Sequence, residues 1–583
     1  MTRLIARIFL PALLLIPQAM QVGRADSGQT AALERQIAPL FAAWDRKDSP
    51  GMSVAVMQHG KVIYSRGFGS AQLEYAAPIT PATIFNVASV SKQFTAMSIL
   101  LLEAEGRLSF DDEVQKYLPW VPRFAYPITL RQLANHTSGV RDHQQLFTLA
   151  GWWSGDVVTM DDIRTLVKHQ RELNFPPLTD TLYSNTGYDL LADVVTAVSG
   201  MPFEQFTQER IFKPLGMSHS HFHTSHKELV PGRAYSYTPA GHGQWRKAVM
   251  NDSYYGSTGL FTTAEDMLLW LDNFRTLKVG GREVIARLLQ APVLSNGKPS
   301  IIFGAPYAAG VSLNQYRGTR MIGQGGVEAG FRAEIDWFPE HDLAIAVLAN
   351  AANGDPQGNL RRIADVVLAG QLQPAPEDPL QRQPVRVATQ RLESYAGTYN
   401  WYFGTVTFVP DRAQGTLVAD ISGSKLPLTA VSEREFVVDL GSLKALLRFG
   451  PGAGDRANDT APVETLEVSF AGGTHPGRRL HLVSLTGSDM VRYVGSYYSP
   501  ELRTSFEIGS GARGLILQHH RQGDIPLLAE KSSGPNPFPV LFAGGPPFAQ
   551  RIQFETAGDG HIRGLRLSGI TVRNLWFQKV TLP

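Results

Sequence analysis

The feature that most constrains this chain is the segment 84–105, which is apolar on nearly every side of a helix. Gly106 follows it and is the residue type that most often ends a helix. A helix without a polar face is stable only inside a core, so the segment predicts a large domain built around a buried helix. The 583 residues are too many for one such domain, and further domains are expected.

Two polar residues stand at the start of this helix. Ser89 is expected in the first turn, where free backbone N–H groups and the helix dipole favour developing negative charge. Lys92 lies three residues later on the same face. Burial lowers the pKa of a lysine, and a neutral amine can then accept the serine proton. A capping serine beside a surface lysine is the alternative, because Ser-x-x-Lys alone is common.

Two further segments suit the same chemistry. Tyr183 and Asn185 stand two residues apart, shortly before a helical stretch at 189–199. A phenol can relay a proton to a leaving group, and an amide can orient a lysine and a substrate carbonyl. The segment 323–327, Gly-Gln-Gly-Gly-Val, enters a strand, where glycines let a substrate backbone approach closely. A backbone N–H there could complete an oxyanion hole with that of Ser89.

These three motifs, in this order, resemble the serine β-lactamase and penicillin-binding protein superfamily. The class C-like branch, with its D-aminopeptidases, D-alanyl-D-alanine carboxypeptidases and esterases, is the closer match. The phrases at 133–140, 214–217 and 256–260 agree with it. The resemblance covers about residues 29–368. It implies an α+β fold in which a five-stranded antiparallel sheet is flanked by helices and joined to a helical lobe.

The resemblance also implies residue roles. Ser89 is similar to the acylated nucleophile of the family, Lys92 to its base and Tyr183 to its proton shuttle. Asn185 is similar to a contact for a substrate amide. The oxyanion hole would be formed by the backbone N–H groups of Ser89 and Val327. No cofactor and no metal ion are implied.

The third motif departs from the family pattern. The family has Lys or His, then Thr, Ser or Gly, then Gly, whereas this chain has Gln324, Gly325 and Gly326. The cation and the hydroxyl that would bind a substrate carboxylate are missing, and a neutral amide binds a carboxylate more weakly. Poor β-lactamase activity and poor cleavage of substrates ending in free D-Ala are therefore expected.

Two charged residues follow the third motif, and each has two interpretations. Arg332 could replace the missing cation, but a structural ion pair is the favoured interpretation. Glu328 could bind a substrate amine, but a solvated loop acid is favoured.

Composition shifts divide the chain into five parts. The first 25 residues have the features of a signal peptide: a positively charged start, an apolar run and the tripeptide Gly-Arg-Ala. Cleavage is expected before Asp26. This indicates a periplasmic or secreted protein without a stable membrane span. A catalytic domain at 29–370 and a Pro- and Gln-rich linker at 371–388 follow. Two β-rich, barrel-like domains are expected at 389–487 and 488–583. The second repeats the first, because Tyr-Ala-Gly-Thr-Tyr at 395 returns as Tyr-Val-Gly-Ser-Tyr at 493.

Composition excludes several other functions. The net charge of +2, from 54 basic and 52 acidic residues, gives no basis for binding nucleic acid. The chain has no cysteine, so disulfides and thiolate catalysis are excluded. A metal site at His219, His221 and His223 is a minor alternative without a nearby acid. The expected partner is a small-molecule or peptide substrate, and the oligomeric state stays open.

The sequence thus predicts a serine hydrolase that forms an acyl-enzyme on Ser89. A peptidase or amidase on small or D-amino-acid-containing peptides is preferred. A carboxylesterase of the same fold is the first alternative. The second, from a different class, is a cell-wall, penicillin-binding or sensing protein whose acyl-enzyme does not turn over.

Overall fold

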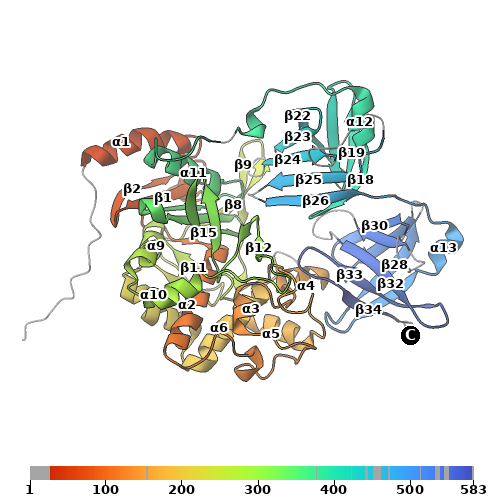
Figure 1. The fold of residues 1–583 in the computed structure, drawn as a ribbon, viewed down its shortest axis with the longest axis horizontal. Coiled ribbons are helices and arrows are strands. Elements are labelled where there is room, and N and C mark those ends of the chain that lie inside the picture. Colours follow the sequence, from red (N-terminus) through yellow and green to blue (C-terminus); the bar gives the residue numbers. More distant parts are fainter. Residues whose placement is uncertain are drawn as a thin grey trace, which may run out of the picture.

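The computed structural model divides into an N-terminal part that mixes helices and strands and two β-barrel parts (Figure 1). It describes residues 27–580, except 153–154, 376, 422, 440–443, 451–460, 471–472, 512–513, 532–538 and 544–549. The expected signal peptide and its cleavage site before Asp26 lie outside the described residues. In the part of the chain that is described, no helix combines the length and the apolar character needed to span a bilayer.

A six-stranded antiparallel sheet forms the centre of the N-terminal part. The resemblance implied five strands, and the count of six, with β14 at one edge, corrects it. Within the sheet, β1 pairs with β2 and β16 with β17, each pair antiparallel. In sheet order the strands are β14 (Ser312–Tyr316), β15 (Thr319–Glu328), β16 (Phe331–Phe338), β17 (Leu343–Ala349), β1 (Met52–Gln58) and β2 (Lys61–Phe68).

Helices cover both faces of this sheet because its central strands are apolar on both sides. Along β1, Val54 and Val56 belong to the core beneath α1 and α11. Ala55 and Met57 belong to the opposite core, which contains α2 and α9. Figure 1 shows the two pairs of helices on the two sides of the sheet. These helices are α1 (Ser27–Ile37), α2 (Ser91–Ala104), α9 (Ala264–Thr276) and α11 (Pro356–Val367).

A helical lobe packs beside the sheet, and its helix α6 lies against α2. The sequence predicted a helix at 189–199, whereas α6 begins at Asn185 and so places that residue at the helix N-terminus. Tyr183 therefore stands just outside the first turn. The remaining helices of this part are α3 (Leu130–Ala134), α4 (His143–Leu149), α5 (Met160–His169), α6 (Asn185–Ser199), α7 (Phe203–Thr207), α8 (Lys213–Leu215) and α10 (Gly281–Leu288).

Short strands connect the lobe to the sheet. One of them, β11, pairs with both β5 and β7 in a small three-stranded sheet beside the start of α2. The short strands are β3 (Ser70–Gln72), β4 (Ala77–Pro78), β5 (Phe85–Asn86), β6 (Val158–Thr159), β7 (His221–Phe222), β8 (Ser236–Gly241), β9 (Gln244–Ala248), β10 (Asp252–Ser253), β11 (Leu260–Thr262), β12 (Ile301–Ile302) and β13 (Ala305–Pro306).

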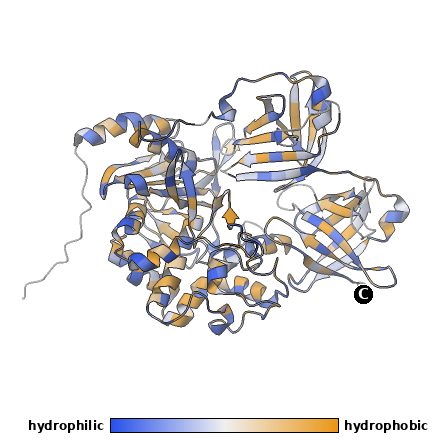
Figure 2. Cartoon of the chain, in the orientation of Figure 1, coloured by the Kyte–Doolittle hydropathy of each residue, from blue (hydrophilic) through white to orange (hydrophobic). Residues whose placement is uncertain are grey.

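The first barrel part is a nine-stranded antiparallel sheet that follows the short helix α12 (Thr389–Tyr395). Hydrophobic and hydrophilic residues alternate along the strands of both barrels (Figure 2), as expected when one face of a strand lines a core. The strands are β18 (Gly397–Trp401), β19 (Gly404–Asp411), β20 (Thr416–Ile421), β21 (Ser424–Pro427), β22 (Thr429–Ala430), β23 (Glu435–Asp439), β24 (Lys444–Phe449), β25 (Thr465–Phe470) and β26 (Gly473–Arg479).

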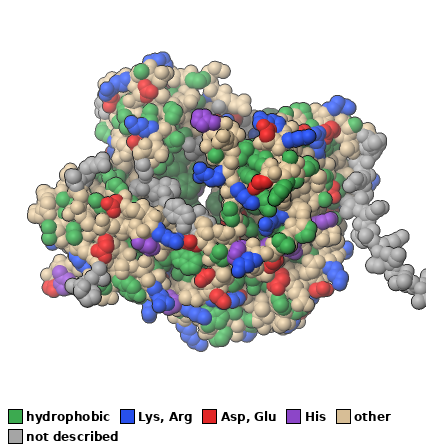
Figure 3. Space-filling view, turned by 180° about the vertical axis from the view of Figure 1, so that it is seen from behind, with side chains coloured by type: hydrophobic (Ala, Val, Ile, Leu, Met, Phe, Trp, Pro, Cys, Tyr) green, Lys and Arg blue, Asp and Glu red, His purple; other side chains and the backbone are tan. Residues whose placement is uncertain are grey.

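The second barrel part closes completely, with β27 paired to both β28 and β34. It follows the short helix α13 (Gly487–Val491). Seen from behind, the molecule is hollowed near its centre, where the three parts meet (Figure 3). The strands are β27 (Gly495–Ser499), β28 (Thr504–Gly511), β29 (Gly514–His519), β30 (Gly523–Glu530), β31 (Val540–Ala543), β32 (Gln550–Thr556), β33 (Ile562–Ser568) and β34 (Leu575–Val580).

The repeated pentapeptide occupies the same position in both barrels, where the chain passes from a short helix into the first strand. Gly397 and Gly495 have φ angles of 138° and 141°, a region that residues with a side chain rarely adopt. The tyrosines two residues later, Tyr399 and Tyr497, are both fully buried. The repeat found in the sequence therefore marks the same junction between a short helix and the first strand in each barrel.

Candidate active site

Ser89 lies in a tight turn between β5 and α2. The turn Ala88–Val90 is a 3-10 helix, and α2 begins only at Ser91, so Ser89 precedes the helix rather than standing in its first turn. Ala88 has a φ angle of 48°, which is strained for a residue with a side chain, and its N–H is held by the Asn86 Oδ1 at 2.7 Å. Ser89 is partly exposed, whereas both of its neighbours are buried.

Lys92 is fully buried in the first turn of α2, directly beside Ser89. Its Nζ lies 3.2 Å from the Ser89 Oγ and donates to the Asn185 Oδ1 and the Ser257 carbonyl oxygen, each at 2.8 Å. Burial lowers the pKa of Lys92 to about 7, against the opposing charges of Asp189, Asp142 and Glu328. A substantial fraction of this amine is therefore neutral at neutral pH.

Tyr183 brings a third polar group to the same point. Its hydroxyl interacts with the Ser89 side chain, and the Lys92 Nζ lies 4.9 Å from the centre of its ring. Burial raises the pKa of Tyr183, so the phenol stays protonated at neutral pH. The ring is packed against that of His136 at 4.3 Å. The structure thus brings Ser89, Lys92 and Tyr183 together.

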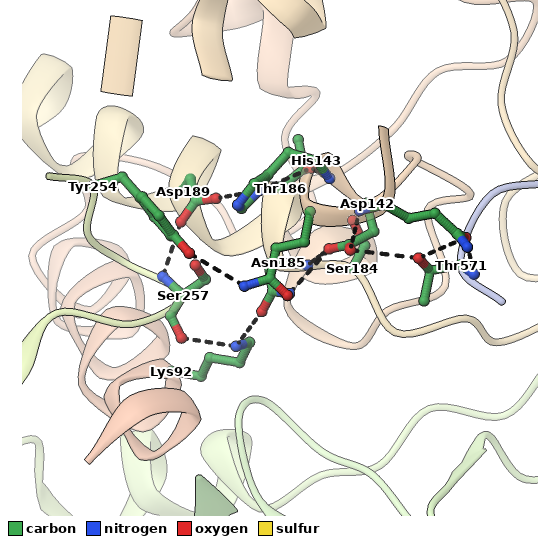
Figure 4. A network of polar contacts seen from close by, with 12 residues as sticks. Lys92, Asp142, His143, Ser184, Asn185, Thr186, Asp189, Tyr254, Ser257 and Thr571 are labelled. Atoms are coloured by element: carbon green, nitrogen blue, oxygen red, sulfur yellow. Dashed lines mark hydrogen bonds and ion pairs between the residues drawn. The ribbon is translucent and has the colours of Figure 1, made fainter. Parts of the chain in front are cut away.

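Asn185 orients Lys92 within the protein (Figure 4). Its Oδ1 accepts from Lys92, while its Nδ2 donates to the Asp142 Oδ1 at 3.0 Å and to the Gln144 Oε1 at 3.2 Å. The resemblance implied that Asn185 contacts a substrate amide. In the structure the same amide is already occupied by protein partners on both sides, which is the geometry of a residue that orients the lysine.

The third motif lies in β15, directly against the turn that carries Ser89. A Cβ atom at Gly326 would lie 2.1 Å from the Val87 carbonyl oxygen, so only glycine permits this approach. The Gln324 side chain is 5% exposed, whereas that of Val327 is 64% exposed. Gly325 stands between them in the strand, opposite Glu334 of β16. The close approach at Gly326 places the Val327 backbone beside the Ser89 turn.

Gly326→Ala is expected to lower both stability and activity, because the new methyl group must displace the backbone at Val87. Overpacking of this kind destabilises a protein by about 1–3 kcal/mol. Denaturant unfolding and a hydrolysis assay measure the two losses. Gly487→Ala is the matched control, since nothing lies within 4 Å of a Cβ atom there. Equal behaviour of the two variants would contradict the proposed close packing.

The surroundings of the two charged residues near the third motif differ from those expected. Glu328 is not a solvated loop acid: it ends β15, and its carboxyl is hydrogen-bonded to that of Asp252. Burial and this neighbouring acid raise the pKa of Glu328 well above its usual range. The Arg332 Nη1 donates to the carbonyl oxygens of Ala329 and Phe331, at 3.1 and 2.7 Å, and within the described ranges Arg332 forms no ion pair.

Sequence reasoning missed the buried acids that surround the lysine. The Asp189 Oδ1 accepts from the N–H of Ser257, whose carbonyl oxygen accepts from Lys92. The other Asp189 oxygen lies 3.1 Å from the Nδ1 of His143, and both side chains are 1% exposed. Asp142 precedes α4, and its role depends on contacts across the fold that no local spacing reveals.

The histidines considered for metal binding pack against aromatic rings. His221 and His223 lie 5.8 and 4.8 Å from the ring of Phe261. Across the ranges that the structure describes, no group of three or more His, Cys, Asp or Glu residues is arranged to hold a metal ion.

The ring of Trp152 packs on that of Phe147, with 4.7 Å between the ring centres.

The chain belongs to the Beta-lactamase family, because the sequence model of this family matches residues 33–368. It is similar to Penicillin-binding protein 4* of Bacillus subtilis (strain 168), with 26% identity over 72% of this chain and 94% of that protein. It is also similar to the D-aminopeptidase of Gluconobacter oxydans (strain 621H), with 28% identity over 55% of this chain. The chain spans 59% of the length of that D-aminopeptidase.

Two solved structures share the fold. The octameric penicillin-binding protein homologue from Pyrococcus abyssi matches with a TM-score of 0.53 and 22% identity, over 78% of this chain and 100% of its own. The structure of SurE with D-Leu matches with a TM-score of 0.50 and 21% identity, over the same shares of the two chains. Together with the family match, these likenesses show the β-lactamase-like fold.

Proposed function

We propose that this protein is a serine hydrolase that cleaves small amides and peptides, including those with D-amino acids, through an acyl-enzyme on Ser89. The observation that carries the proposal is the contact between the Lys92 Nζ and the Ser89 Oγ at 3.2 Å, with the lysine fully buried. A lysine whose pKa has been lowered to about 7 by burial can remove the serine proton near neutral pH.

In the acylation step the Ser89 oxygen attacks the substrate carbonyl carbon while its proton passes to the Lys92 nitrogen. The carbonyl oxygen becomes negatively charged, and the backbone N–H groups of Ser89 and Val327 are the proposed donors to it. The bond to the leaving nitrogen then breaks. The leaving amine takes a proton from the phenol of Tyr183, which Lys92 reprotonates.

Deacylation uses the same base with water as the nucleophile. A water molecule loses its proton to Lys92 and attacks the ester carbon, and the bond to the Ser89 oxygen breaks as the serine regains a proton. Because the pKa of Lys92 is lowered, its amine acts as the base. Because the pKa of Tyr183 is raised, its phenol acts as the proton donor.

The substrate class follows from the relatives and from the third motif. A relative named D-aminopeptidase matches the catalytic part of the chain, which supports amide substrates with D-residues. The neutral, buried side chain of Gln324 supports substrates without a free carboxylate beside the scissile bond. The same loss of charge favours a carboxylesterase as the second candidate.

A substrate panel separates these functions. D-Ala-p-nitroanilide, L-Ala-p-nitroanilide and p-nitrophenyl butyrate are each compared with a Ser89→Ala blank. The proposal expects the D-anilide to be turned over with a kcat/KM above that of the L-anilide. Turnover of the butyrate alone would identify an esterase. A stable adduct on Ser89 in intact-mass spectra, without turnover of any substrate, would identify a binding or sensing protein.

Hydrolysis of nitrocefin by the pure protein is expected to be slow. The loss of one charged donor to the β-lactam carboxylate weakens substrate binding by about 10- to 100-fold. Arg332, considered as a replacement, is anchored on backbone carbonyl oxygens. The change in absorbance of nitrocefin measures the rate directly. Gln324→Lys, which restores the cation, is expected to raise it, and fast turnover by the unchanged protein would contradict the argument.

A further inference from the structure

A loop of the second barrel reaches the helical lobe beside the candidate site. This loop, residues 569–574, joins β33 to β34. The N–H of Thr571 donates to the Gln145 Oε1 at 2.6 Å, and its carbonyl oxygen accepts from the Asn174 Nδ2 at 3.0 Å. The backbone N–H of Arg573 donates a hydrogen bond to the Asn174 Oδ1 at 2.7 Å. Thr571 and Arg573 therefore both fix the loop on the catalytic part.

A buried ion pair also connects the second barrel to the catalytic part near this loop. The Arg141 Nη1 lies 2.8 Å from the Glu501 Oε2 of the second barrel, and their side chains are 0% and 4% exposed. The Arg141 Nη2 also donates to the carbonyl oxygen of Arg573 in the loop, at 3.1 Å. A charge removed from water in this way is costly unless its partner stays in place, so the position of Arg141 depends on the barrel.

Asp142 follows Arg141 in the chain. It contacts both the second barrel and Asn185, the residue that holds Lys92 (Figure 4). The Thr571 hydroxyl lies 3.4 Å from the Asp142 Oδ2 and 3.1 Å from the Gln145 Oε1, so both acceptors share its single proton. The backbone N–H of Gln145 also donates to the Asp142 Oδ2 at 3.4 Å, and the backbone N–H of Asn185 donates to the Asp142 Oδ1 at 2.8 Å. The same Oδ1 accepts from the Asn185 Nδ2, which forces the amide oxygen to point the other way, toward Lys92.

We propose that the second barrel is a positioning element of the active site, in which Thr571 holds Asp142, Asp142 orients the Asn185 amide, and this amide holds Lys92 beside Ser89. The inference rests on the proposed function and deepens it, since it gives the second barrel a role in catalysis without any contact to the substrate. Thr571 is a positioning residue, not a catalytic one.

Thr571→Val tests the proposal because valine keeps the shape of threonine and removes only the hydroxyl. We expect kcat to fall about 3- to 10-fold, the change that loss of one hydrogen bond brings, with KM within twofold of the wild-type value. Thr571→Ser restores the hydroxyl and is expected to restore kcat. Glu501→Gln, which removes the charge facing Arg141, is expected to give a larger fall of the same kind.

The pH profile supplies a readout that a purely structural role would not move. Asp142 is one of three carboxylates, with Asp189 and Glu328, whose charges raise the pKa of Lys92 against the effect of burial. When Thr571 no longer holds Asp142, this opposing effect weakens. The acid limb of kcat/KM is then expected to move to lower pH in Thr571→Val.

Arg521→Gln is the matched control. Arg521 joins the same barrel to the carbonyl oxygen of Gly151 and to Asp156, away from Asp142. The proposal expects its kcat and its pH profile to stay unchanged. It is overturned if Thr571→Val keeps the wild-type kcat and profile, or if Arg521→Gln shows the same losses.

A second measurement is independent of turnover. NMR titration of the protein labelled with ¹³C-lysine, with Lys92→Met to assign the signal, follows the protonation of Lys92 directly. A shifted titration midpoint in Thr571→Val, and none in Arg521→Gln, supports the positioning role even where no substrate is found. An unshifted midpoint overturns it, whereas absence of all turnover with a shifted midpoint counts against the proposed function alone.

Discussion

Ser89→Ala is expected to reduce hydrolysis of every substrate in the panel to the background rate, a loss of roughly 10⁴-fold or more. The loss is this large because the acyl-enzyme has no other oxygen on which to form. Ser89 is the partly exposed residue of its turn, between buried neighbours, and its oxygen contacts both Lys92 and Tyr183. Intact-mass spectra with a fluorophosphonate check the same point, because the adduct should be absent from the variant.

Ser91→Ala controls for the removal of a hydroxyl from the same segment. The Ser91 Oγ accepts from the N–H of Leu260 at 3.1 Å and is fully buried, so its loss affects packing rather than the reaction. Its kcat is expected to stay within a few-fold of wild type. A Ser89→Ala protein that still forms the phosphonate adduct would place the nucleophile elsewhere.

Lys92→Met is expected to lower kcat/KM by about 10²- to 10⁴-fold, the contribution of a well-placed general base. Methionine has a similar length and no charge, so it suits a fully buried position. Lys213→Met, at a lysine that is 71% exposed, is the matched control and is expected to be active. Retention of a tenth or more of the wild-type kcat/KM by Lys92→Met would remove the lysine from the mechanism.

The pH dependence of the wild-type enzyme tests the same residue. Only the neutral amine can accept the serine proton, and the pKa of Lys92 is lowered to about 7. Below this pH, kcat/KM is expected to rise about tenfold per pH unit, and above it to level off. A limb centred near the ordinary pKa of lysine would show that the amine is not buried in solution.

The local patterns of the sequence predicted much of the fold because the elements concerned are specified locally. A short, almost continuous apolar run defines β1, and the all-round apolar segment after Ser89 defines α2. The sheet has six strands instead of five because β14 pairs as an additional edge, which no short-range pattern signals. The start of α6 was placed four residues late because polar residues precede its apolar stretch.

The site was only partly predictable for a related reason. Motif spacing identified Ser89, Lys92 and Tyr183, and the structure brings them together. For Asn185 it allowed contacts both to the lysine and to a substrate carbonyl, but it did not reveal the amide's partner Asp142, which is 43 residues away in the chain. The pairing of Glu328 with Asp252 was missed in the same way, since only the fold brings the two acids together.

The buried ion pair between Arg141 and Glu501 also has a consequence for the order of events during synthesis. All six strands of the central sheet have been translated once residue 349 leaves the ribosome. Glu172 lies 3.8 Å from Arg141 within the catalytic part, but the buried partner of Arg141, Glu501, lies 360 residues further along the chain. Because domains generally fold in the order of their synthesis, the catalytic part can assemble early, while the surroundings of Asp142 are completed only when the last barrel has been made.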